Sequence, residues 1–279
     1  MNGMSMTNSF ELLCPVCGDV LNGAERTFAC SQGHSFDISK RGYLNLLLGT
    51  SKGHHGDDKL MVRARTDFLS KGYYDRLSEA VCTLADEVTD AAPAIIDAGC
   101  GEGKYTADLL RSLRSKGKTP AMLAVDISKD AVDALLRREK GLQAVVASTA
   151  ALPVRDGAAD LLVNIFSPFF REEFRRVLNK GGRLIRVVPL KDHLYELKQL
   201  VYDHAYYNDV PDYEEPGFEI VQRQTVEYSI TLSSNADIRS LFLMTPYYYK
   251  TGAEDQKKLE TADHLDVTLQ FGILLYQAV

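Results

Sequence analysis

The sequence is short of several features that define specialised protein classes. No apolar run approaches the roughly 20 residues needed to span a bilayer, and the first residues, MNGMSMTNSF, lack the basic start and apolar stretch of a secretory signal. No internal repeat and no low-complexity tract is found. The net charge of −6 argues against a surface coated in positive charge, although Lys and Arg can still gather locally. These absences favour a cytoplasmic globular protein.

Cysteine is scarce, but its few copies are clustered. Three of the five cysteines, with one histidine, form the pattern C-x2-C-x12-C-x3-H: Cys14, Cys17, Cys30 and His34. In the reducing cytoplasm such clusters more often bind metal than form disulfides. Four nitrogen and sulfur donors suit a tetrahedral Zn²⁺, and because no position is left for water we predict a structural site. The alternatives are a redox C-x-x-C, which lacks a thioredoxin-like βαβ context here, and cysteines that are unrelated to one another.

A regular alternation of strands and helices begins near residue 94. Two late strands, 225–232 and 265–276, lie around a helical stretch at 236–243 and, with a short connection, suit an antiparallel hairpin. The pattern predicts an α/β fold with a doubly wound, mostly parallel sheet and helices on both faces. The apolar spacing predicts strands at 94–98, 121–126, 143–147, 159–166 and 183–188, a turn at 180–182, and helical segments at 59–89, 104–116, 129–140 and 172–178.

The strongest signal is a glycine-rich loop directly after the first of these strands. Asp97 is followed by Gly99, Gly101 and Gly103, and a helix begins at Lys104. Glycines let the backbone turn tightly and approach a ligand near a helix N-terminus. The dinucleotide fingerprint would need a glycine at position 104. The spacing D-x-G-x-G-x-G instead resembles motif I of the Rossmann-like class I methyltransferases, which bind S-adenosylmethionine.

Three further strand ends complete the expected cofactor site. Asp126 ends the second strand, where this class places a carboxylate that accepts both ribose hydroxyls. Ser148 and Thr149 follow the third strand, at the position expected near adenine. The fourth strand ends in the segment 164–168, which commonly faces the methyl group and the acceptor in this fold. A strand end stopped by proline is the structural alternative for that segment.

Together the motifs resemble the RlmA-type methyltransferases, which modify N1 of a guanine in 23S ribosomal RNA. The resemblance covers nearly the whole chain, and the zinc spacing joined to residues 40–47 is its most specific part. Besides the zinc ligands, the matching motifs are Phe36-Asp37, Lys40-x-Gly42-Tyr43-x-Asn45-Leu46-Leu47, Gly56-Asp57, Met61-x-x-Ala64-Arg65-x-x-Phe68-Leu69, Asp97-x-Gly99-Cys100-Gly101-Glu102-Gly103, Asp126-x-Ser128-Lys129, His193-Leu194-x-Glu196-Leu197-Lys198 and Met244-Thr245-Pro246.

The resemblance implies contacts, partners and a division of the chain. By similarity, Tyr74, Gly101, Glu102 and His193 contact the cofactor, and the zinc module helps to hold the 23S rRNA. A homodimer would suit the resemblance. The expected parts are a zinc-ribbon-like RNA-recognition module at 1–50, a linker and helical segment at 51–90 that packs on the cofactor domain, and a methyltransferase domain with a seven-stranded sheet at 91–279.

Basic residues gather between the zinc ligands and the first long helix. Over residues 38–66 there are six Lys or Arg against two Asp, and His54 and His55 lie among them. Such an excess can contact RNA phosphates, although a solvated surface is the plainer interpretation. The basic positions are 40, 41, 52, 59, 63 and 65.

Methyl transfer to guanine N1 requires positioning and the removal of one proton. No residue stands out as the base. Asn164 and the Ser167 hydroxyl can hydrogen-bond the guanine edge, and His193 can alternatively accept the proton. N1 lies on the Watson–Crick edge, so the target must be unpaired or extruded from its helix. The run 247–249, three tyrosines, can supply a stacking surface, although core packing of at least two of them is the plainer expectation.

Two rival functions stay open at this stage. One is a methyltransferase of the same fold that acts on a small molecule or a protein. The other is a catalytically silent zinc-ribbon protein that binds RNA. The appended zinc module argues against the first, and the intact glycines and acids of the loop argue against the second.

Overall fold

The structure is a computed structural model that describes residues 10–24, 26–48 and 56–279. The expectations for residues 1–9 and for Lys52, His54 and His55 in the linker lie outside these residues. Within the described part, no helix is long and apolar enough to cross a membrane.

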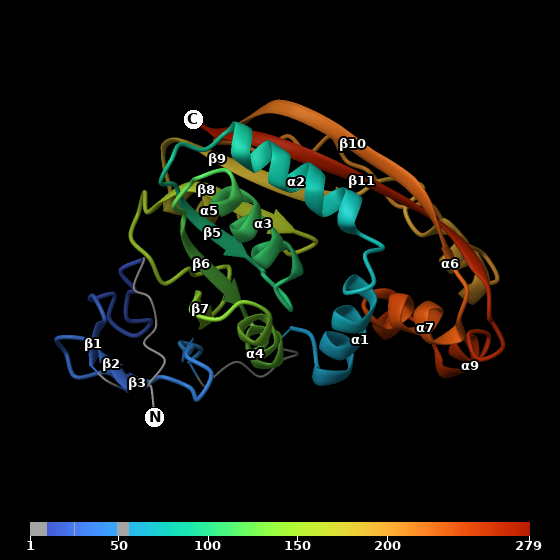
Figure 1. The fold of residues 1–279 in the computed structure, drawn as a ribbon, viewed down its shortest axis with the longest axis horizontal. Coiled ribbons are helices and arrows are strands. Elements are labelled where there is room, and N and C mark those ends of the chain that lie inside the picture. The colour runs from blue at the N-terminus through green and yellow to red at the C-terminus, as the bar shows by residue number, and fades with distance from the viewer. Residues whose placement is uncertain (1–9, 25, 49–55) are drawn as a thin grey trace.

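Two sheets organise the chain (Figure 1). The strands are β1 (Asn22–Ala24), β2 (Thr27–Ala29), β3 (Ser35–Asp37), β4 (Leu44–Asn45), β5 (Ala94–Ala98), β6 (Ala121–Asp126), β7 (Gln143–Val146), β8 (Ala159–Ile165), β9 (Leu178–Pro189), β10 (Phe218–Leu232) and β11 (Leu265–Ala278). The order β1-β2-β3 forms a small antiparallel sheet. The large sheet has the order β10-β11-β9-β8-β5-β6-β7-β4, and its neighbours are parallel except that β11 runs antiparallel to both β9 and β10.

Helices cover both faces of the large sheet. They are α1 (Lys59–Leu69), α2 (Asp75–Glu87), α3 (Lys104–Ser115), α4 (Lys129–Arg138), α5 (Arg171–Val177), α6 (Tyr195–Val201), α7 (Asn235–Leu243), α8 (Tyr247–Lys250) and α9 (Ala253–Lys257). Apolar residues of α2, α3 and α4 share one core with one face of the sheet, and those of α5 share a second core with the other face. Figure 1 shows α1 beyond the arrowheads of β5 and β6, between α4 and α7.

Successive residues of each buried strand point to opposite faces of the sheet and so contribute to two different cores. Leu161 and Val163 of β8 face the first core, whereas Leu162 between them faces the second. This alternation follows from the two-residue period of a strand, and both sets are apolar because both faces are covered. The predicted doubly wound, mostly parallel sheet is thereby confirmed.

The structure departs from the sequence predictions in four places. An eighth strand, β4, extends the expected seven and pairs parallel with β7. The hairpin pairing of β10 and β11 is confirmed, but the predicted short connection is wrong, because residues 233–264 between them carry three helices. The helical segment expected at 59–89 is interrupted at 70–74, where Gly72 has φ +83. The turn expected at 180–182 lies within β9, where the pairing with β8 shifts register.

The N-terminal segment is docked on the β7 edge of the large sheet. The side-chain amide of Gln143 makes two hydrogen bonds to the backbone of Phe10, and the Leu13 N–H donates to the Pro153 carbonyl at 2.8 Å. Leu44 of β4 is fully buried, in the same core as the second face of the sheet. The zinc-ligand segment and the large sheet therefore share one apolar core.

Candidate cofactor site and metal centre

The glycine loop after β5 is held tightly against the neighbouring strand end. Gly99 has φ +94, and a Cβ there would lie 2.1 Å from the Ser167 Oγ, so only glycine allows the loops after β5 and β8 to pack this closely. Gly101, with φ +54, meets only one atom within 4 Å of its Cβ position, the Arg65 Nη1 at 3.6 Å. The backbone at Gly101 is accessible to a ligand, and Gly103 precedes α3.

Two carboxyl groups lie beside this loop at the ends of β5 and β6. Asp126 accepts the Gly101 N–H and the Ser128 N–H, each at 2.8 Å, so one oxygen of its carboxylate points to each of two loops. Burial raises the pKa of Asp126, and these backbone donors lower it in part. Asp97 is more deeply buried and accepts only the Thr106 hydroxyl, at 2.6 Å. Burial, with the charge of Asp126 adding to it, raises the pKa of Asp97 to about 7.

An ion pair lies beside the glycine loop. It joins Asp57, which precedes α1, to Arg65 within α1. Arg65 pairs with Asp57 and donates to the Met244 carbonyl at 2.9 Å. Asp57 in turn accepts the Ser128 hydroxyl through its backbone carbonyl at 2.6 Å. Sequence reasoning placed Arg65 among residues that can contact RNA phosphates and did not assign it to the cofactor site. The sequence feature that could have indicated this position is the presence of Arg65 in a motif shared with the RlmA-type enzymes.

The end of β8 brings Asn164 and Ser167 to the same edge. Asn164 is buried, and its amide nitrogen donates to the Ala98 carbonyl at 3.2 Å and to the Pro168 carbonyl at 3.3 Å. It thereby ties the end of β5 to the loop after β8. Among the described residues, its Oδ1 is one of the few buried side-chain oxygens that lack a hydrogen-bond partner.

His193 lies against the aromatic rings at this edge. Its Nδ1 accepts the Gln270 backbone N–H at 3.3 Å, so in the neutral imidazole the proton resides on Nε2. Burial, with the charge of Lys198 adding to it, lowers the pKa of His193 to about 3. The side chain is therefore a neutral donor through Nε2 and a poor proton acceptor.

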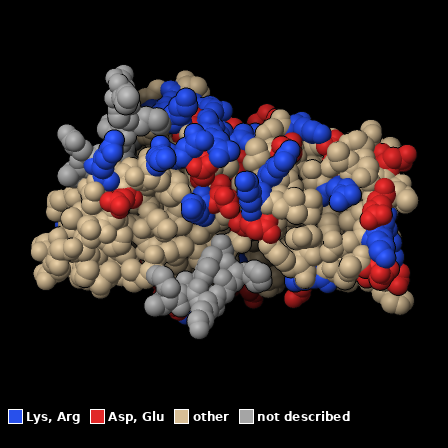
Figure 2. All heavy atoms as spheres, turned by 90° about the horizontal axis from the view of Figure 1, so that it is seen from below, with Lys and Arg blue, Asp and Glu red and all other residues tan. Residues whose placement is uncertain are grey.

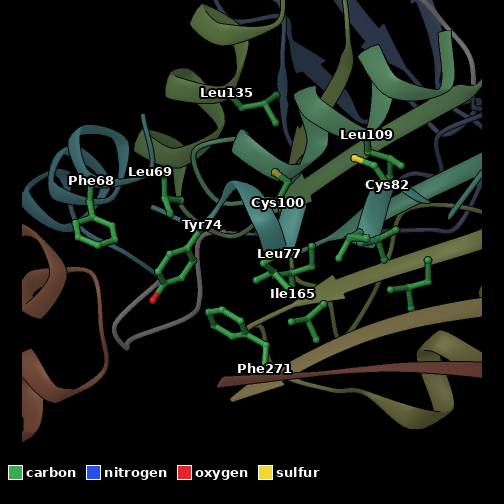
Figure 3. Packing of buried hydrophobic residues seen from close by; sticks show 14 of the residues in the cluster. Phe68, Leu69, Tyr74, Leu77, Cys82, Cys100, Leu109, Leu135, Ile165 and Phe271 are labelled. Atoms are coloured by element: carbon green, nitrogen blue, oxygen red, sulfur yellow. The ribbon is translucent and has the colours of Figure 1, made fainter. Parts of the chain in front are cut away.

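Tyr74 belongs to the same aromatic group. Its ring lies 5.7 Å from that of Phe68 and 5.2 Å from that of Phe271, both edge-on, and Figure 3 shows it standing between these two side chains. The His193 ring follows at 6.5 Å. Nearby, the buried hydroxyl of Tyr105 has no hydrogen-bond partner in the described part of the chain. The site thus holds a donor and an acceptor, Tyr105 and Asn164, that a polar ligand can satisfy.

The remaining expected cofactor residues are held by other groups. Glu102 is buried, pairs with Arg138 at 2.6 Å and accepts the Lys104 N–H at 3.1 Å, which turns it toward the end of α4. The Ser148 hydroxyl accepts the Ala150 N–H at 3.2 Å in the turn after β7. The adjacent Ala147 N–H donates to the Asp126 carbonyl, which keeps Ser148 and Thr149 near the end of β6.

The four predicted metal ligands come together in the N-terminal segment. Cys14 and Cys17 lie in one tight turn, and Cys30 and His34 lie in the turn between β2 and β3. The donor atoms lie within 4.8 Å of one another. Cys17 Sγ lies 3.6 Å from Cys30 Sγ, and His34 Nδ1 lies 3.6 Å from Cys14 Sγ and 3.3 Å from Cys30 Sγ. Tetrahedral Zn²⁺ with bonds of about 2.0–2.3 Å separates its donors by about 3.5–3.8 Å, and two of these distances, both 3.6 Å, fall in that range. Small side-chain shifts would bring the remaining separations into it, so the donor set fits zinc.

Family models match both parts of the chain. The model described as "RlmA, N-terminal", a zinc ribbon, matches residues 12–53, which include all four candidate ligands. A model described as a methyltransferase domain matches residues 95–186, from β5 into β9. The cofactors of this chain are therefore S-adenosylmethionine and zinc.

Curated relatives match over most of their length. The chain is 34% identical to the 23S rRNA (guanine(748)-N(1))-methyltransferase of Streptomyces fradiae over 81% of each chain. It is 31% identical to a candidate 23S rRNA (guanine-N(1)-)-methyltransferase of Bacillus subtilis (strain 168), over 98% of this chain and 99% of the relative. A solved candidate methyltransferase from Bacillus halodurans has the same fold with a TM-score of 0.50 at 15% identity, over 71% of this chain and 97% of its own.

Proposed function

Because the chain belongs to the RlmA family of 23S rRNA (guanine-N1)-methyltransferases, we propose that it transfers a methyl group from S-adenosylmethionine to N1 of one guanine in 23S rRNA. One observation carries the proposal: a zinc-ligand cluster of the RlmA type and a glycine–acid cofactor site are built on one continuous core. A methyltransferase that acts on small molecules has little use for the first of these.

The cofactor supplies a methyl group that is already activated on a sulfonium. The chain's main contribution is then to hold the two reactants in line, which can lower the barrier by roughly 7–11 kcal/mol. In this proposal Asp126 accepts the ribose hydroxyls, and Gly99, Gly101 and Gly103 let the backbone approach the amino-acid part. Support for the polar contacts comes from the unpartnered Asn164 Oδ1 and Tyr105 hydroxyl. Tyr74 and the turn at 148–149 are assigned to the same site in this proposal.

The proton on guanine N1 has to leave, and His193 is unsuited to accept it. With its pKa lowered to about 3, the imidazole does not hold a second proton at neutral pH. We propose that His193 instead donates from Nε2, either to the cofactor or to an acceptor on the guanine edge. Ser167, half-buried beside Gly99, is the hydroxyl nearest to the glycine loop at the end of β8.

Asn164 is proposed to set the position of the guanine by holding the loops after β5 and β8 together. Replacing it by Ala removes the two hydrogen bonds to Ala98 and Pro168. We expect Asn164→Ala to lower the methyl-transfer rate far more than the cofactor affinity, measured by single-turnover kinetics and by calorimetry. An unchanged methyl-transfer rate in Asn164→Ala would contradict this role.

RNA is proposed to be held by the zinc module at 1–50 and by basic side chains near it. Figure 2 shows Lys and Arg gathered on the face that carries α4 and α1. The side chains of Arg41, Arg63 and Arg137 are 51–82% exposed, although each also has an acidic neighbour. Exposed guanidinium groups can exchange such neighbours for phosphates. The segment at 51–90 would then link this module to the methyltransferase domain at 91–279.

The proposed activity is tested by transfer of tritium from labelled S-adenosylmethionine into 23S rRNA from a strain that lacks N1-methylguanine there, followed by nuclease mapping. Label at a single N1-methylguanine supports the proposal and identifies the guanine. Absence of label in naked and assembled RNA, with cofactor binding intact, would favour a small-molecule or protein substrate, or a silent RNA-binding protein.

A cytoplasmic location and a homodimer are part of the same proposal. A ribosomal RNA substrate requires the enzyme where ribosomes are made, and two copies would double the basic surface offered to one RNA. Light scattering of the full chain tests the dimer: a mass near 62 kDa, twice the 31.0 kDa of one chain, supports it, and 31.0 kDa contradicts it.

A further inference from the structure

Phe166 is an exposed aromatic residue at the carboxyl end of β8. It is 44% exposed and is the only phenylalanine among the large apolar side chains that the described part of the chain exposes. Its backbone has φ +52, a left-handed conformation that non-glycine residues rarely adopt. Such strain persists only where the surroundings enforce it, and it is concentrated at functional sites.

The positive φ redirects the Phe166 ring. In an extended strand, residue 166 would face the same side as Asn164 and Leu162, which lie two and four positions earlier. Its ring instead contacts Phe271 at a centroid distance of 5.6 Å and Tyr105 at 6.5 Å, and both of these belong to the core on the opposite face or pack against it. The backbone conformation therefore moves an aromatic ring to the side of the sheet edge that carries the cofactor loop.

Neighbouring rings buttress Phe166 without covering it. The His193 ring lies 6.4 Å away and is nearly parallel, with an interplanar angle of 12°. Phe271 and Tyr105 close the ring from other sides. The adjacent Ser167 packs directly on Gly99 of the cofactor loop. The Phe166 ring is thus exposed to solvent, and the next residue in the chain, Ser167, contacts the glycine loop.

We propose that Phe166 is the stacking platform for the extruded target guanine, an assignment that rests on the proposed function. A base removed from its helix loses two stacking neighbours, and an aromatic side chain can replace one of them. The flat guanine face would cover the exposed part of the ring, while His193 and Ser167 supply polar groups at its rim. Phe166 is then a substrate-contacting residue that positions N1 for methyl transfer.

The test compares side chains at position 166 for which the positive φ costs a similar conformational energy. Phe166→Ala, Phe166→Leu and Phe166→Tyr are neither glycine nor β-branched, so each accepts the positive φ at a similar cost to Phe. Val221→Ala, on the outer strand β10, is the matched control, because Val221 is an apolar residue of similar exposure, 42%. Single-turnover methyl transfer to 23S rRNA lacking N1-methylguanine, S-adenosylmethionine affinity by calorimetry and RNA affinity by filter binding are measured for each.

We expect Ala and Leu to slow single-turnover transfer by roughly 10- to 100-fold, since loss of one base–aromatic stack is of this order, and Tyr to stay within about threefold of the parent chain. Cofactor affinity should stay within about twofold in all variants, and Val221→Ala should change nothing. A Leu variant with the parent rate overturns the assignment. A fall in cofactor affinity as large as the fall in rate also overturns it, because Phe166 would then line the cofactor. No transfer by the parent chain overturns the proposed function itself, and this assignment with it.

Discussion

At the residue scale, the two acids of the cofactor site differ in how their charge is stabilised. Asp126 accepts two backbone N–H groups, whereas Asp97 accepts a single hydroxyl in a fully buried position. Hydrogen bonds from backbone amides favour the ionised form, and burial without them disfavours it. The backbone donors therefore stabilise the charge of Asp126, as the proposed ribose contact requires, whereas ionisation of Asp97 at neutral pH lowers the stability of the fold.

The raised pKa of Asp97 predicts a specific pH dependence of stability. The carboxyl group has a pKa of about 7 in the folded protein against an ordinary value of 3.8, so between these values the folded chain holds a proton that the unfolded chain has released. The free energy of unfolding therefore falls as pH rises through this interval, on the order of 2–4 kcal/mol in all. We expect Asp97→Asn to be stabilised relative to the parent at pH 8 and not at pH 4.

Urea unfolding of the cofactor-free protein at several pH values measures this difference. Asp130→Asn, at an exposed acid in the first turn of α4, is the control for the loss of one carboxyl group. Parallel profiles for Asp97→Asn and the parent would show that Asp97 is ionised in the folded protein.

At the element scale, the segment that precedes α1 links the helix to the end of β6. Gly56 has φ +72, and a Cβ there would lie 2.6 Å from the Ile127 Cγ2. Asp58 caps α1 by accepting the Met61 N–H at 2.9 Å. The close approach at Gly56 and this cap aim α1 so that Arg65, two turns later, reaches Asp57 and the glycine loop.

Gly56→Ala should displace this segment from β6. We expect a loss of about 1–3 kcal/mol in stability, from the left-handed backbone and the steric clash together, and a weaker affinity for S-adenosylmethionine. Gly117→Ala is the control, because Gly117 has φ +81 with open space around its Cβ position and so reports the backbone cost alone. Equal losses for the two variants, with unchanged cofactor affinity, would contradict the role of the close contact.

The zinc turns are a second element whose geometry depends on a ligand. We expect the Cys30→Ser variant to lose the zinc ion, because three donors bind Zn²⁺ far more weakly than four. We expect zinc content near one per chain in the parent and near zero in the variant, measured by mass spectrometry of the metal. Methylation of rRNA should fall much more than cofactor affinity.

Cys82→Ala, which removes a cysteine of α2 outside the cluster, should keep its zinc. A Cys30→Ser protein that retains zinc and full activity on rRNA would contradict the assignment of Cys30 as a ligand.

At the scale of the whole molecule, the N-terminal module and the large sheet are one packing unit. Phe10, Leu12 and Leu44 pack in the same core as β6 and β8, and β4 completes the sheet. Elements that share a core unfold cooperatively. The molecule should therefore melt as one unit, and damage to the junction should lower the stability of both parts.

Leu44→Ala tests this coupling. Truncating a fully buried leucine costs about 2–5 kcal/mol, so we expect a single calorimetric transition at a lower temperature than in the parent. Leu48→Ala is the control, since Leu48 is 45% exposed and should change little. Two separate transitions, of which only the smaller one shifts in Leu44→Ala, would mean that the module folds independently.

The sequence by itself determined the features that depend on local spacing. The zinc ligands were found because two short turns, each with two donors, must meet at one ion. The glycine–acid site was predicted because strand ends of a parallel sheet fall at one edge, whatever the details of packing, and the structure brings the glycine loop and Asp126 together there. The alternating apolar runs predicted the strands of the sheet for the same reason: a strand buried on both faces is apolar along its length.

Only the tertiary structure decided which distant groups meet. Arg65 contacts Asp57 and the Met244 carbonyl, and Glu102 pairs with Arg138. His193 is neutral because it is buried, and it donates through Nε2 because the Gln270 N–H occupies its other nitrogen. Phe166 faces the cofactor edge because its φ is positive. Each outcome depends on the packing of segments far apart in sequence, and spacing along one chain does not specify that geometry.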